Sequence, residues 1–183
     1  MNELKGKKVA ILATDGFEES ELFEPKKALE ENGAIVHIIS PEKGKIKAWN
    51  HGNWSKDINV DITLSNSIDM DYDALFLPGG VINPDKLRRD ERAVDFVQRF
   101  MFGGKLVAAI CHGPQLLIEA DVVEGRRMTS FSSIKKDLMN AGAEWVDEEV
   151  VIDNNLITSR SPKDLKAFNK KLIEEVAKVV ETV

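Results

Sequence analysis

The most informative segment of this chain is Leu106-Val107-Ala108-Ala109-Ile110-Cys111-His112-Gly113-Pro114. Its first five residues are apolar without alternation, which is typical of a strand buried on both faces of a parallel sheet. The only cysteine of the chain follows at once, and Gly113 lets the backbone turn sharply into a helix. We therefore expect Cys111 to stand at the carboxyl end of a central strand, the position of the nucleophile in α/β hydrolases.

Short apolar runs alternate with longer amphipathic segments along the whole chain, which indicates stacked βαβ units. The other buried strands are expected at residues 9–13, 35–39 and 74–77. Ser20 is expected to cap a helix that runs to Asn32 and stops at Gly33. Further helices are expected over residues 93–100, after Gly113 and over residues 165–179. Residues 46–64 lack a helical period and predict a hairpin or an edge excursion. The pattern predicts one α/β domain over residues 1–183, with an open, mostly parallel sheet and helices on both faces.

Composition and charge exclude several classes of function. The net charge of −6 is spread along the chain with acids and bases interleaved, which disfavours nucleic acid or an anionic membrane as a partner. No apolar run approaches the length of about 20 residues that spans a membrane. A single cysteine cannot form an intramolecular disulfide, so we expect a soluble, cytoplasmic protein with a free thiol. No zinc spacing, Gly-x-Gly-x-x-Gly or Walker loop occurs, so we expect neither a metal nor a cofactor.

Three loops that follow predicted strands concentrate reactive or flexible residues. They are Asp15-Gly16-Phe17-Glu18-Glu19, Pro78-Gly79-Gly80 and Cys111-His112-Gly113-Pro114. In an open parallel sheet such loops emerge at one rim, and ligands bind outside the carboxyl ends of the strands. The sequence therefore predicts a site that combines carboxyl groups, two glycines and a thiol.

Each candidate residue also has a structural interpretation. The helix that follows Cys111 would lower the pKa of the thiol, but free cysteine is also among the residues most often buried in cores. His112 is a candidate base, although neighbours in sequence seldom face each other, and it could be a capping or solvent-facing residue. His37 is expected in the core and His51 in a turn near the edge of the site.

The acids and glycines leave two questions open. Glu18, Glu19 and Glu21 begin a helix, where acids are expected in any case, so composition does not select the one that points at the thiol. Gly79 and Gly80 form either a plain turn or the N–H donors of an oxyanion hole.

These segments resemble the ThiJ/PfpI superfamily, in its PfpI-like branch of intracellular proteases and general stress proteins. The resemblance rests on Ala109-Ile110-Cys111-His112-Gly113-Pro114, Phe17-Glu18, Leu77-Pro78-Gly79-Gly80, Asn140-Ala141-Gly142-Ala143 and Thr158-Ser159-Arg160-Ser161-Pro162. It covers nearly the whole chain and implies a flavodoxin-like, glutamine-amidotransferase-like fold. Three residues, 81–83, separate the glycine turn from Pro84, one more than this family leads us to expect.

The resemblance also implies roles for individual residues. Glu18 would contact the thiol of Cys111 as a protonated carboxyl group, and backbone groups of Gly80 and His112 would form an anion pocket. Asp85 of the partner subunit would orient His112, so a homodimer would be the smallest complete unit.

Three functions are compatible with such a site. The first is an enzyme that uses Cys111 on reactive carbonyl compounds, in the manner of a glutathione-independent glyoxalase or deglycase. The second is a cysteine peptidase or amidase with Cys111, His112 and Asp85 as its triad. The third is a redox-responsive stress protein whose thiol is oxidised. The aromatic excursion at residues 48–54 would line the substrate cavity or cover a subunit interface.

Overall fold

A computed structural model of the chain describes residues 3–180 and is built on a seven-stranded sheet. Its strand order is β11-β12-β8-β7-β1-β3-β6, and every neighbouring pair is parallel except β11 and β12. The strands are β1 (Lys8–Leu12), β3 (Ile35–Ser40), β6 (Ile62–Thr63), β7 (Ala74–Leu77), β8 (Leu106–Ile110), β11 (Val150–Asp153) and β12 (Leu156–Ser159).

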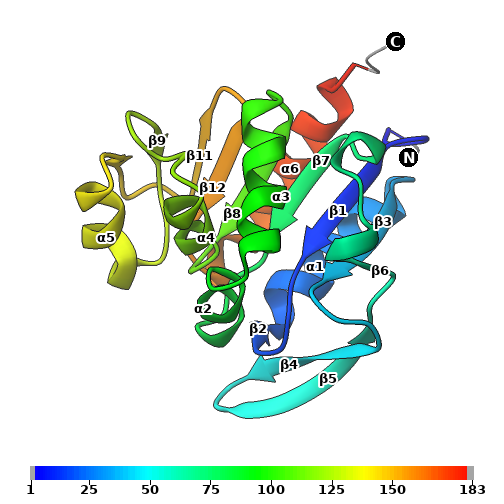
Figure 1. The fold of residues 1–183 in the computed structure, drawn as a ribbon. Coiled ribbons are helices and arrows are strands. Elements are labelled where there is room, and N and C mark those ends of the chain that lie inside the picture. Colours follow the sequence, from blue (N-terminus) through cyan, green and yellow to red (C-terminus); the bar gives the residue numbers. More distant parts are fainter. Residues whose placement is uncertain (1–2, 181–183) are drawn as a thin grey trace.

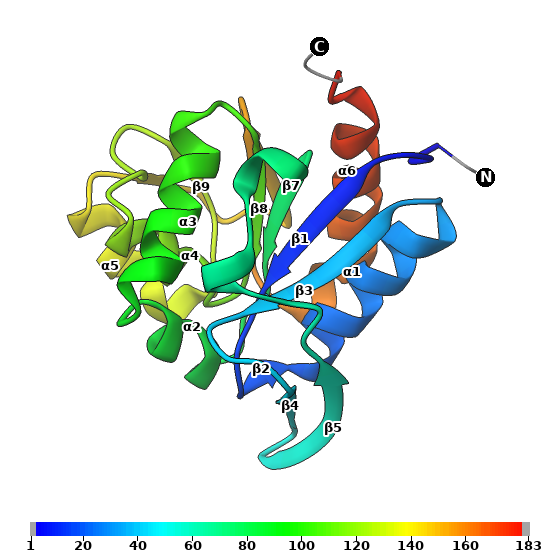
Figure 2. The ribbon, with the colours of Figure 1, turned by 45° about the vertical axis from the view of Figure 1, so that its right-hand side comes forward.

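Helices cover both faces of this sheet, as Figure 2 shows. One face carries α1 (Glu19–Glu31) and α6 (Leu165–Lys178), which pack against each other. The other face carries α3 (Glu91–Phe102) and α4 (Pro114–Glu119), with α2 (Ile82–Leu87) and α5 (Lys135–Asn140) on the same side. The predicted fold class, an open and mostly parallel sheet between two helical layers, is confirmed.

The two helical layers explain why the central strands are continuously apolar. In β1, Val9 and Ile11 belong to the core beneath α1 and α6, whereas Ala10 and Leu12 belong to the core beneath α3 and α4. Successive strand residues point to opposite faces, and both faces are buried here, so no position can be polar. Burial on both sides also fixes the register of each strand.

A hairpin stands apart from the main sheet, at the bottom of Figure 1. Strands β4 (Lys45–Asn50) and β5 (Asn53–Asn59) pair antiparallel, and β4 also pairs with the short β2 (Phe17–Glu18). The turn uses His51 and Gly52, both with positive φ, as a two-residue hairpin loop requires. The predicted hairpin and the turn position of His51 are confirmed. A further pair, β9 (Arg127–Met128) and β10 (Glu144–Trp145), lies beside α5.

Two local expectations need comment. Ser20 is not the cap of the first helix, because α1 already begins at Glu19 with Glu18 at the N-cap position. The end of α1 is as expected, with Asn32 at the C-cap and Gly33 at a φ of 96°. His37 is half-buried, and its Nδ1 lies 3.0 Å from the hydroxyl of Tyr72, which agrees with a core histidine that has a polar partner.

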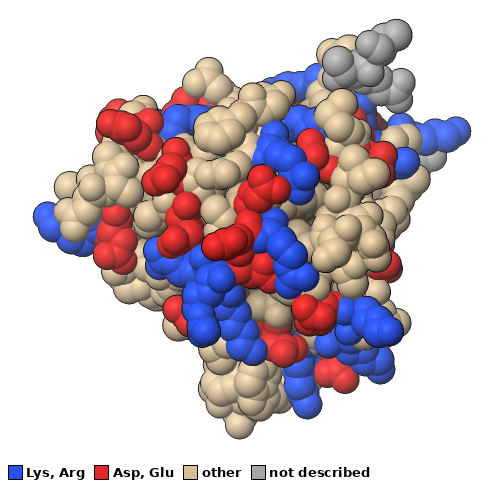
Figure 3. Space-filling view, in the orientation of Figure 1, with Lys and Arg blue, Asp and Glu red and all other residues tan. Residues whose placement is uncertain are grey.

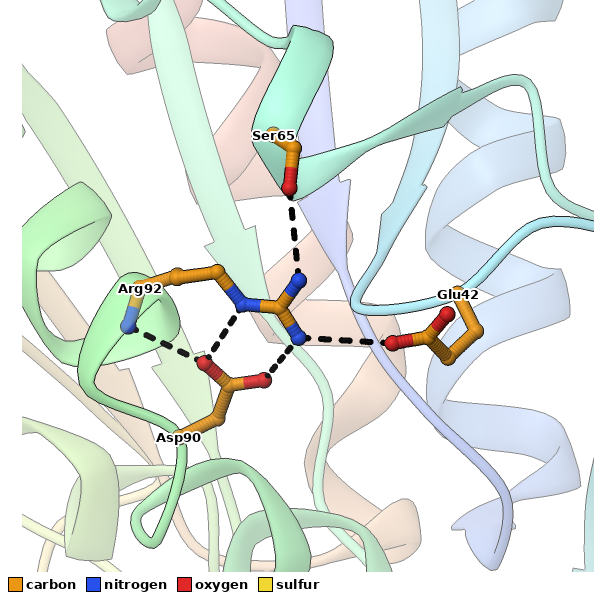
Figure 4. A network of polar contacts seen from close by, with 4 residues as sticks. All are labelled: Glu42, Ser65, Asp90 and Arg92. Carbon is orange, nitrogen blue, oxygen red and sulfur yellow. Dashed lines mark hydrogen bonds and ion pairs between the residues drawn. The ribbon is translucent and has the colours of Figure 1, made fainter.

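The start of α3 is fastened by one arginine, shown in Figure 4. Asp90 caps the helix by accepting a hydrogen bond of 3.0 Å from the backbone N–H of Arg92. The guanidinium of Arg92 bonds the same carboxylate and also reaches Ser65 and Glu42. Hydrogen bonds from Arg92 hold the pKa of Asp90 below its ordinary value. The loops after β3 and β6 are thereby tied to the first turn of α3.

The surface mixes charges of both signs, and the two ends of the described chain lie at one edge of the sheet. Positive and negative side chains are interspersed over the face drawn in Figure 3. No helix in residues 3–180 has the length and apolar character needed to cross a membrane. Val179 and Val180 lie beside Asp73 and Leu106, at the amino ends of β7 and β8, where β1 also begins (Figure 1). Both ends of the described chain thus lie at the amino edge of the sheet.

Candidate active site

The three predicted loops converge on a cavity at the opposite, carboxyl edge. Because β12, β8, β7 and β1 are neighbours and parallel, the loops that follow them meet there. The cavity has a volume of about 420 Å³. Residues from all four loops, from the hairpin and from the segment after β9 line it: Gly16, Glu18, Glu21, Trp49, Gly80, Val81, Ile82, Cys111, His112, Phe131 and Pro162.

Cys111 lies at the floor of this cavity in a left-handed backbone conformation, with a φ of 61°. Left-handed backbone is strained for a residue with a side chain, and such strain concentrates at functional sites. The amide of Cys111 donates a 3.1 Å hydrogen bond to the carbonyl of Ser159 on β12. A Cβ on Gly113 would come within 2.5 Å of the Leu77 carbonyl, so only glycine lets the chain pass this close to β7.

The turn at Cys111 makes two consecutive side chains face one cavity. The sulfur of Cys111 lies 3.3 Å from Nδ1 of His112, which is within the reach of a proton transfer. The Cys111 side chain is 6% exposed, so it is buried yet borders the cavity. Cys111 thus belongs to the core beneath α1 and α6 and at the same time borders the cavity.

The carboxyl group that contacts the thiol belongs to Glu21, not to Glu18. Glu21 is fully buried, its Oε2 and the Cβ of Cys111 both lie against Gly79, and the same Oε2 accepts a 2.9 Å hydrogen bond from the amide of Gly79. Its Oε1 is buried and has no partner of good hydrogen-bond geometry among residues 3–180. The expected contact between Glu18 and the thiol is therefore wrong, and Glu18 borders the cavity without reaching the sulfur.

Helix geometry explains the difference. Glu18 ends β2 in extended conformation before α1 begins, whereas Glu21 lies in the first turn of the helix. Glu21 shares the buried side of α1 with Leu22, Pro25 and Leu29. A charged residue four and eight positions before two buried apolar residues lies on the apolar stripe of a helix. That spacing is the signal in the sequence that identifies Glu21.

Burial determines the protonation states of Glu21 and Cys111. Loss of solvent raises the pKa of Glu21 to about 8, so its carboxyl group is mostly protonated at neutral pH. Burial also raises the pKa of the Cys111 thiol, and charge on Glu21 would raise it further, although N–H groups of His112 and Gly80 act in the opposite direction. The expectation of a thiol with a lowered pKa is wrong, because burial outweighs the donors at the helix start. Cys111 rests as a thiol beside a protonated acid.

The two glycines after β7 have different roles. The amide of Gly79 is engaged by Glu21, so the expectation that it belongs to an oxyanion hole is wrong. A Cβ at Gly79 would collide with Glu21 and with Cys111, which explains the glycine. Backbone N–H groups of Gly80 and His112 lower the pKa of the Cys111 thiol, so both lie close to the sulfur. Their role as an anion pocket stays a prediction. Gly80 has a φ of 81°, which favours glycine.

His112 is held by residues of its own chain. Its ring stacks on Phe131, with centroids 4.9 Å apart, and its Nε2 lies 3.1 Å from the hydroxyl of Ser133. Burial lowers the pKa of His112, so the ring is mostly neutral at neutral pH. Asp85 is exposed on α2 and does not line the cavity. Its contact with the histidine of a partner subunit stays a prediction.

Asn83 is a positioning residue that the sequence did not reveal. It is fully buried, accepts a 2.8 Å hydrogen bond from the amide of Thr14 and donates to the carbonyls of Pro78 and Gly79. These three bonds join the loop after β1 to the glycine turn after β7. Residues 81–83, which looked like an insertion, thus begin α2 and lock two walls of the site together.

The hairpin supplies one wall of the cavity. Trp49 lines it and packs edge-to-face on Trp54, with ring centroids 5.1 Å apart. Of the two uses considered for the aromatic excursion, a cavity wall is therefore confirmed for Trp49. No group of three or more histidine, cysteine or acidic side chains within residues 3–180 has the arrangement of a metal site.

Comparison with known proteins agrees with this geometry. A family model described as "DJ-1/PfpI family" matches residues 7–175. "General stress protein 18" of Bacillus subtilis is 46% identical over 167 residues, which are 91% of this chain and 95% of that protein. "Protein/nucleic acid deglycase 2" of Escherichia coli is 45% identical over 168 residues, 91% of this chain and 96% of that protein.

A solved structure supports the same relationship. It is a two-domain protein from Anabaena variabilis, with DJ-1/ThiJ/PfpI-like and ferritin-like domains. It superimposes with a TM-score of 0.88 at 43% identity, over 93% of this chain and 48% of that one, so this chain spans about half of it. The resemblance noted in the sequence is confirmed, and the chain belongs to the DJ-1/PfpI family.

Proposed function

We propose that this protein is a stress-response enzyme that converts reactive 2-oxoaldehydes, free or bound to amines and thiols, into 2-hydroxy acids through Cys111. The observation that carries the proposal is the pairing of the Cys111 thiol with the buried, protonated carboxyl group of Glu21, beside a neutral His112. Addition of a thiol to an aldehyde needs one group that accepts the thiol proton and another that protonates the carbonyl oxygen. The site holds both.

The first step forms a bond between the sulfur of Cys111 and the aldehyde carbon of methylglyoxal. Nδ1 of His112 takes the thiol proton, and the carbonyl oxygen takes the proton of Glu21, which gives a hemithioacetal. The Glu21 carboxylate then removes the hydrogen from the former aldehyde carbon, while His112 protonates the ketone oxygen. The product is an enediol, and both protein groups regain their resting protonation.

The second half of the cycle completes an internal oxidation and reduction. Glu21 protonates the second carbon of the enediol and His112 accepts the hydroxyl proton, so the sulfur now carries a lactoyl thioester. Water attacks the thioester carbon, Glu21 accepts a proton from water, and the leaving sulfur takes the proton of His112. The balance is methylglyoxal plus water to lactic acid, without an external oxidant or reductant. A hemiaminal formed from methylglyoxal and an amine would first break its C–N bond, with its hydroxyl proton passing to the nitrogen. This releases the free amine, and the aldehyde that forms then enters the same sequence.

The other two interpretations have weaker support. A peptidase triad needs a group that orients the histidine, and within one chain His112 bonds the hydroxyl of Ser133 rather than a carboxylate. An oxidation sensor needs a thiolate at rest, whereas burial raises the pKa of Cys111. The relative named as a deglycase agrees with carbonyl chemistry. We also propose a homodimer, and a cytoplasmic location in which the single cysteine stays reduced.

The test is to measure lactate formed from methylglyoxal by proton NMR, because loss of methylglyoxal alone would also report its reaction with surface amines. We expect turnover by the wild-type protein, none by Cys111→Ala, and a loss of about 100-fold or more in kcat/KM for Glu21→Gln. Glu19→Gln is the matched control, since Glu19 pairs with Lys56 and does not line the cavity.

Two further measurements separate the alternatives: a peptide-hydrolysis assay and the intact mass of the protein after treatment with peroxide. Hydrolysis of casein or of a peptide library that depends on Cys111, without lactate formation, would establish the peptidase interpretation. A gain of two oxygens on Cys111 in mild peroxide, again without lactate formation, would favour the redox interpretation. In either case the carbonyl proposal would be abandoned.

A further inference from the structure

We propose that Glu18 makes the cavity selective for charge, so that it accepts neutral or cationic carbonyl compounds with a flat apolar group and rejects anionic ones. The inference deepens the proposed function by naming a substrate class, and it gives Glu18 a binding role in place of the catalytic one expected from the sequence. It rests on the side chains that line the cavity and on those that do not.

The charges on the cavity wall have one sign. Two carboxyl groups, of Glu18 and Glu21, line the cavity, and no lysine or arginine does. Glu21 is fully buried and committed to Cys111 and to the amide of Gly79. Glu18 is half-buried and has no lysine or arginine within ion-pair distance among residues 3–180. It is therefore the carboxyl group that a bound cation would meet.

The cations of neighbouring segments lie outside the cavity, and three of them form ion pairs there. Lys163, beside the lining residue Pro162, is exposed to solvent and does not line the cavity. The titratable neighbours that act on Glu18 most strongly are His51 and Glu19. The paired cations are Lys56 with Glu19 at 2.8 Å, Lys86 with Asp15 at 3.7 Å, and Arg160 with Asp164 at 2.9 Å and Asp147 at 2.8 Å. An anionic ligand would meet no lysine or arginine side chain on the cavity wall, so its charge would lose solvent without gaining an ion pair.

The rest of the wall suits a flat apolar group. Trp49 and Phe131 are aromatic, and Val81, Ile82 and Pro162 complete the apolar side. The volume of about 420 Å³ is several times that of a three-carbon oxoaldehyde, so a larger substituent can be enclosed. Aromatic faces also attract planar cations. The carboxylate of Glu18 and the aromatic side chains of the wall thus both favour planar cations.

Three planar probes of nearly equal size test this without any turnover: benzamidinium, benzamide and benzoate. Their dissociation constants are measured by NMR titration against the Cys111→Ala protein at pH 8. We expect benzamidinium to bind about tenfold more tightly than benzoate, with benzamide between them, because a charge-assisted hydrogen bond contributes this much. Glu18→Gln should bring benzamidinium and benzamide within about twofold of each other.

Glu19→Gln is the matched control, because it removes a neighbouring carboxylate that is paired and lies outside the cavity. It should keep the benzamidinium preference. Equal binding of benzoate and benzamidinium, a preference that survives Glu18→Gln, or no binding of benzamidinium at millimolar concentration would each overturn the inference. Because the assay needs no catalysis, its result is independent of whether lactate is formed.

Discussion

At the scale of single residues, the site depends on a proton that is shared by buried groups. Cys111 and Glu21 come from segments 90 positions apart and meet only because Gly79 leaves room between them. Neither group carries its usual charge in the resting protein, since burial disfavours both anions. The chemistry therefore begins from a neutral site and separates charge only after a substrate has entered.

Glu21 should make the protein less stable as the pH rises. Its pKa is near 4.5 in the unfolded chain and about 8 in the folded one, so the folded state keeps a proton that the unfolded state releases. The free energy of unfolding should then fall between these two values, by a few kcal/mol in total. Glu21→Gln has no titrating group at this position, so its free energy of unfolding should increase relative to that of the wild type across the same pH range. Urea unfolding at several pH values measures this difference.

Glu19→Gln serves as the control for that series. Hydrogen bonds from Lys56 and Ser55 lower the pKa of Glu19, so its contribution to stability is lost only at acid pH. Above its ordinary pKa the control and the wild type should lose stability in parallel. Parallel curves for wild type and Glu21→Gln would show instead that Glu21 is ionised in the folded protein.

Ser133 should position the imidazole of His112. Its hydroxyl can donate to Nε2 or accept from it, so it supports the histidine in both protonation states that the mechanism uses. Ser133→Ala should lower kcat/KM for lactate formation by roughly three- to tenfold and alter its pH profile. Because Ser133 is exposed, the melting temperature should barely change. Ser133→Thr should restore the rate, and Ser132→Ala should have no effect.

Which site residues the sequence can reveal depends on how local their signals are. Cys111, His112 and Gly80 follow strands directly, so the strand pattern alone placed them at one rim. Glu21 and Asn83 are different, because they act through hydrogen bonds to segments 58 and 69 positions away. Such partners depend on tertiary packing. Spacing can place Glu21 on the buried side of its helix, but it does not identify the group that Glu21 meets there. An acid in the first turn of a helix is also expected simply because it stabilises the helix dipole, so Glu21 does not stand out in the sequence.

At the scale of elements, the hairpin of β4 and β5 controls the shape of the cavity. Trp49→Ala should raise KM for phenylglyoxal by about tenfold, because a half-buried aromatic wall of the cavity is lost. KM for methylglyoxal should rise less, since the smaller substrate leaves that wall largely untouched. Steady-state kinetics with both substrates measures the contrast.

Trp54→Ala is the control for the hairpin. Trp54 is 48% exposed and touches the cavity only through the ring of Trp49. Its loss should affect KM for phenylglyoxal less than the loss of Trp49. Equal effects of both variants on both substrates would mean that the hairpin acts through overall stability and not through contact with the substrate.

Strands were more predictable than helices at this scale. Burial on both sides imposes a continuous apolar run, which can be read directly at β1, β7 and β8. The six-residue α2 contains Pro84 and carries no periodic signal, so the sequence does not predict it. The observed N-cap of α1, Glu18, lies two residues before the expected cap Ser20, because Glu18 takes this position without a side-chain cap that the sequence could reveal.

At the scale of the whole molecule, the open question is whether two chains share one site. We expect light scattering to give a mass about twice the 20.4 kDa of one chain, as for a homodimer. Asp85 of the partner subunit would then act on His112 through the hydroxyl of Ser133 or in its place. Asp85 is exposed on α2, so it is available for such a contact.

Two engineered heterodimers distinguish sharing between chains from action within one chain. In the first, one chain carries Cys111→Ala and the other carries Asp85→Asn. If Asp85 acts across the interface, one complete site remains and about half of the activity is kept. In the second, both changes are on one chain and the other is wild type, and this dimer should be inactive. The reverse pattern would show that Asp85 serves its own chain.

The molecule as a whole was the most predictable level. Alternation of apolar runs with amphipathic segments left only a few compatible topologies, because crossovers between parallel strands are right-handed and short. The antiparallel β11 and the separate sheet of the hairpin depend on local turns, and the sequence indicated them only as hairpins.

Both ends of the described chain lie at the amino edge of the sheet, and the cavity opens at the other edge. A second protein, an affinity tag or a solid support joined at either end would therefore stay on the far side from the incoming substrate. Immobilised or fused forms should keep an unobstructed entrance. The protein could therefore be attached to other proteins or to surfaces through either end without blocking the cavity.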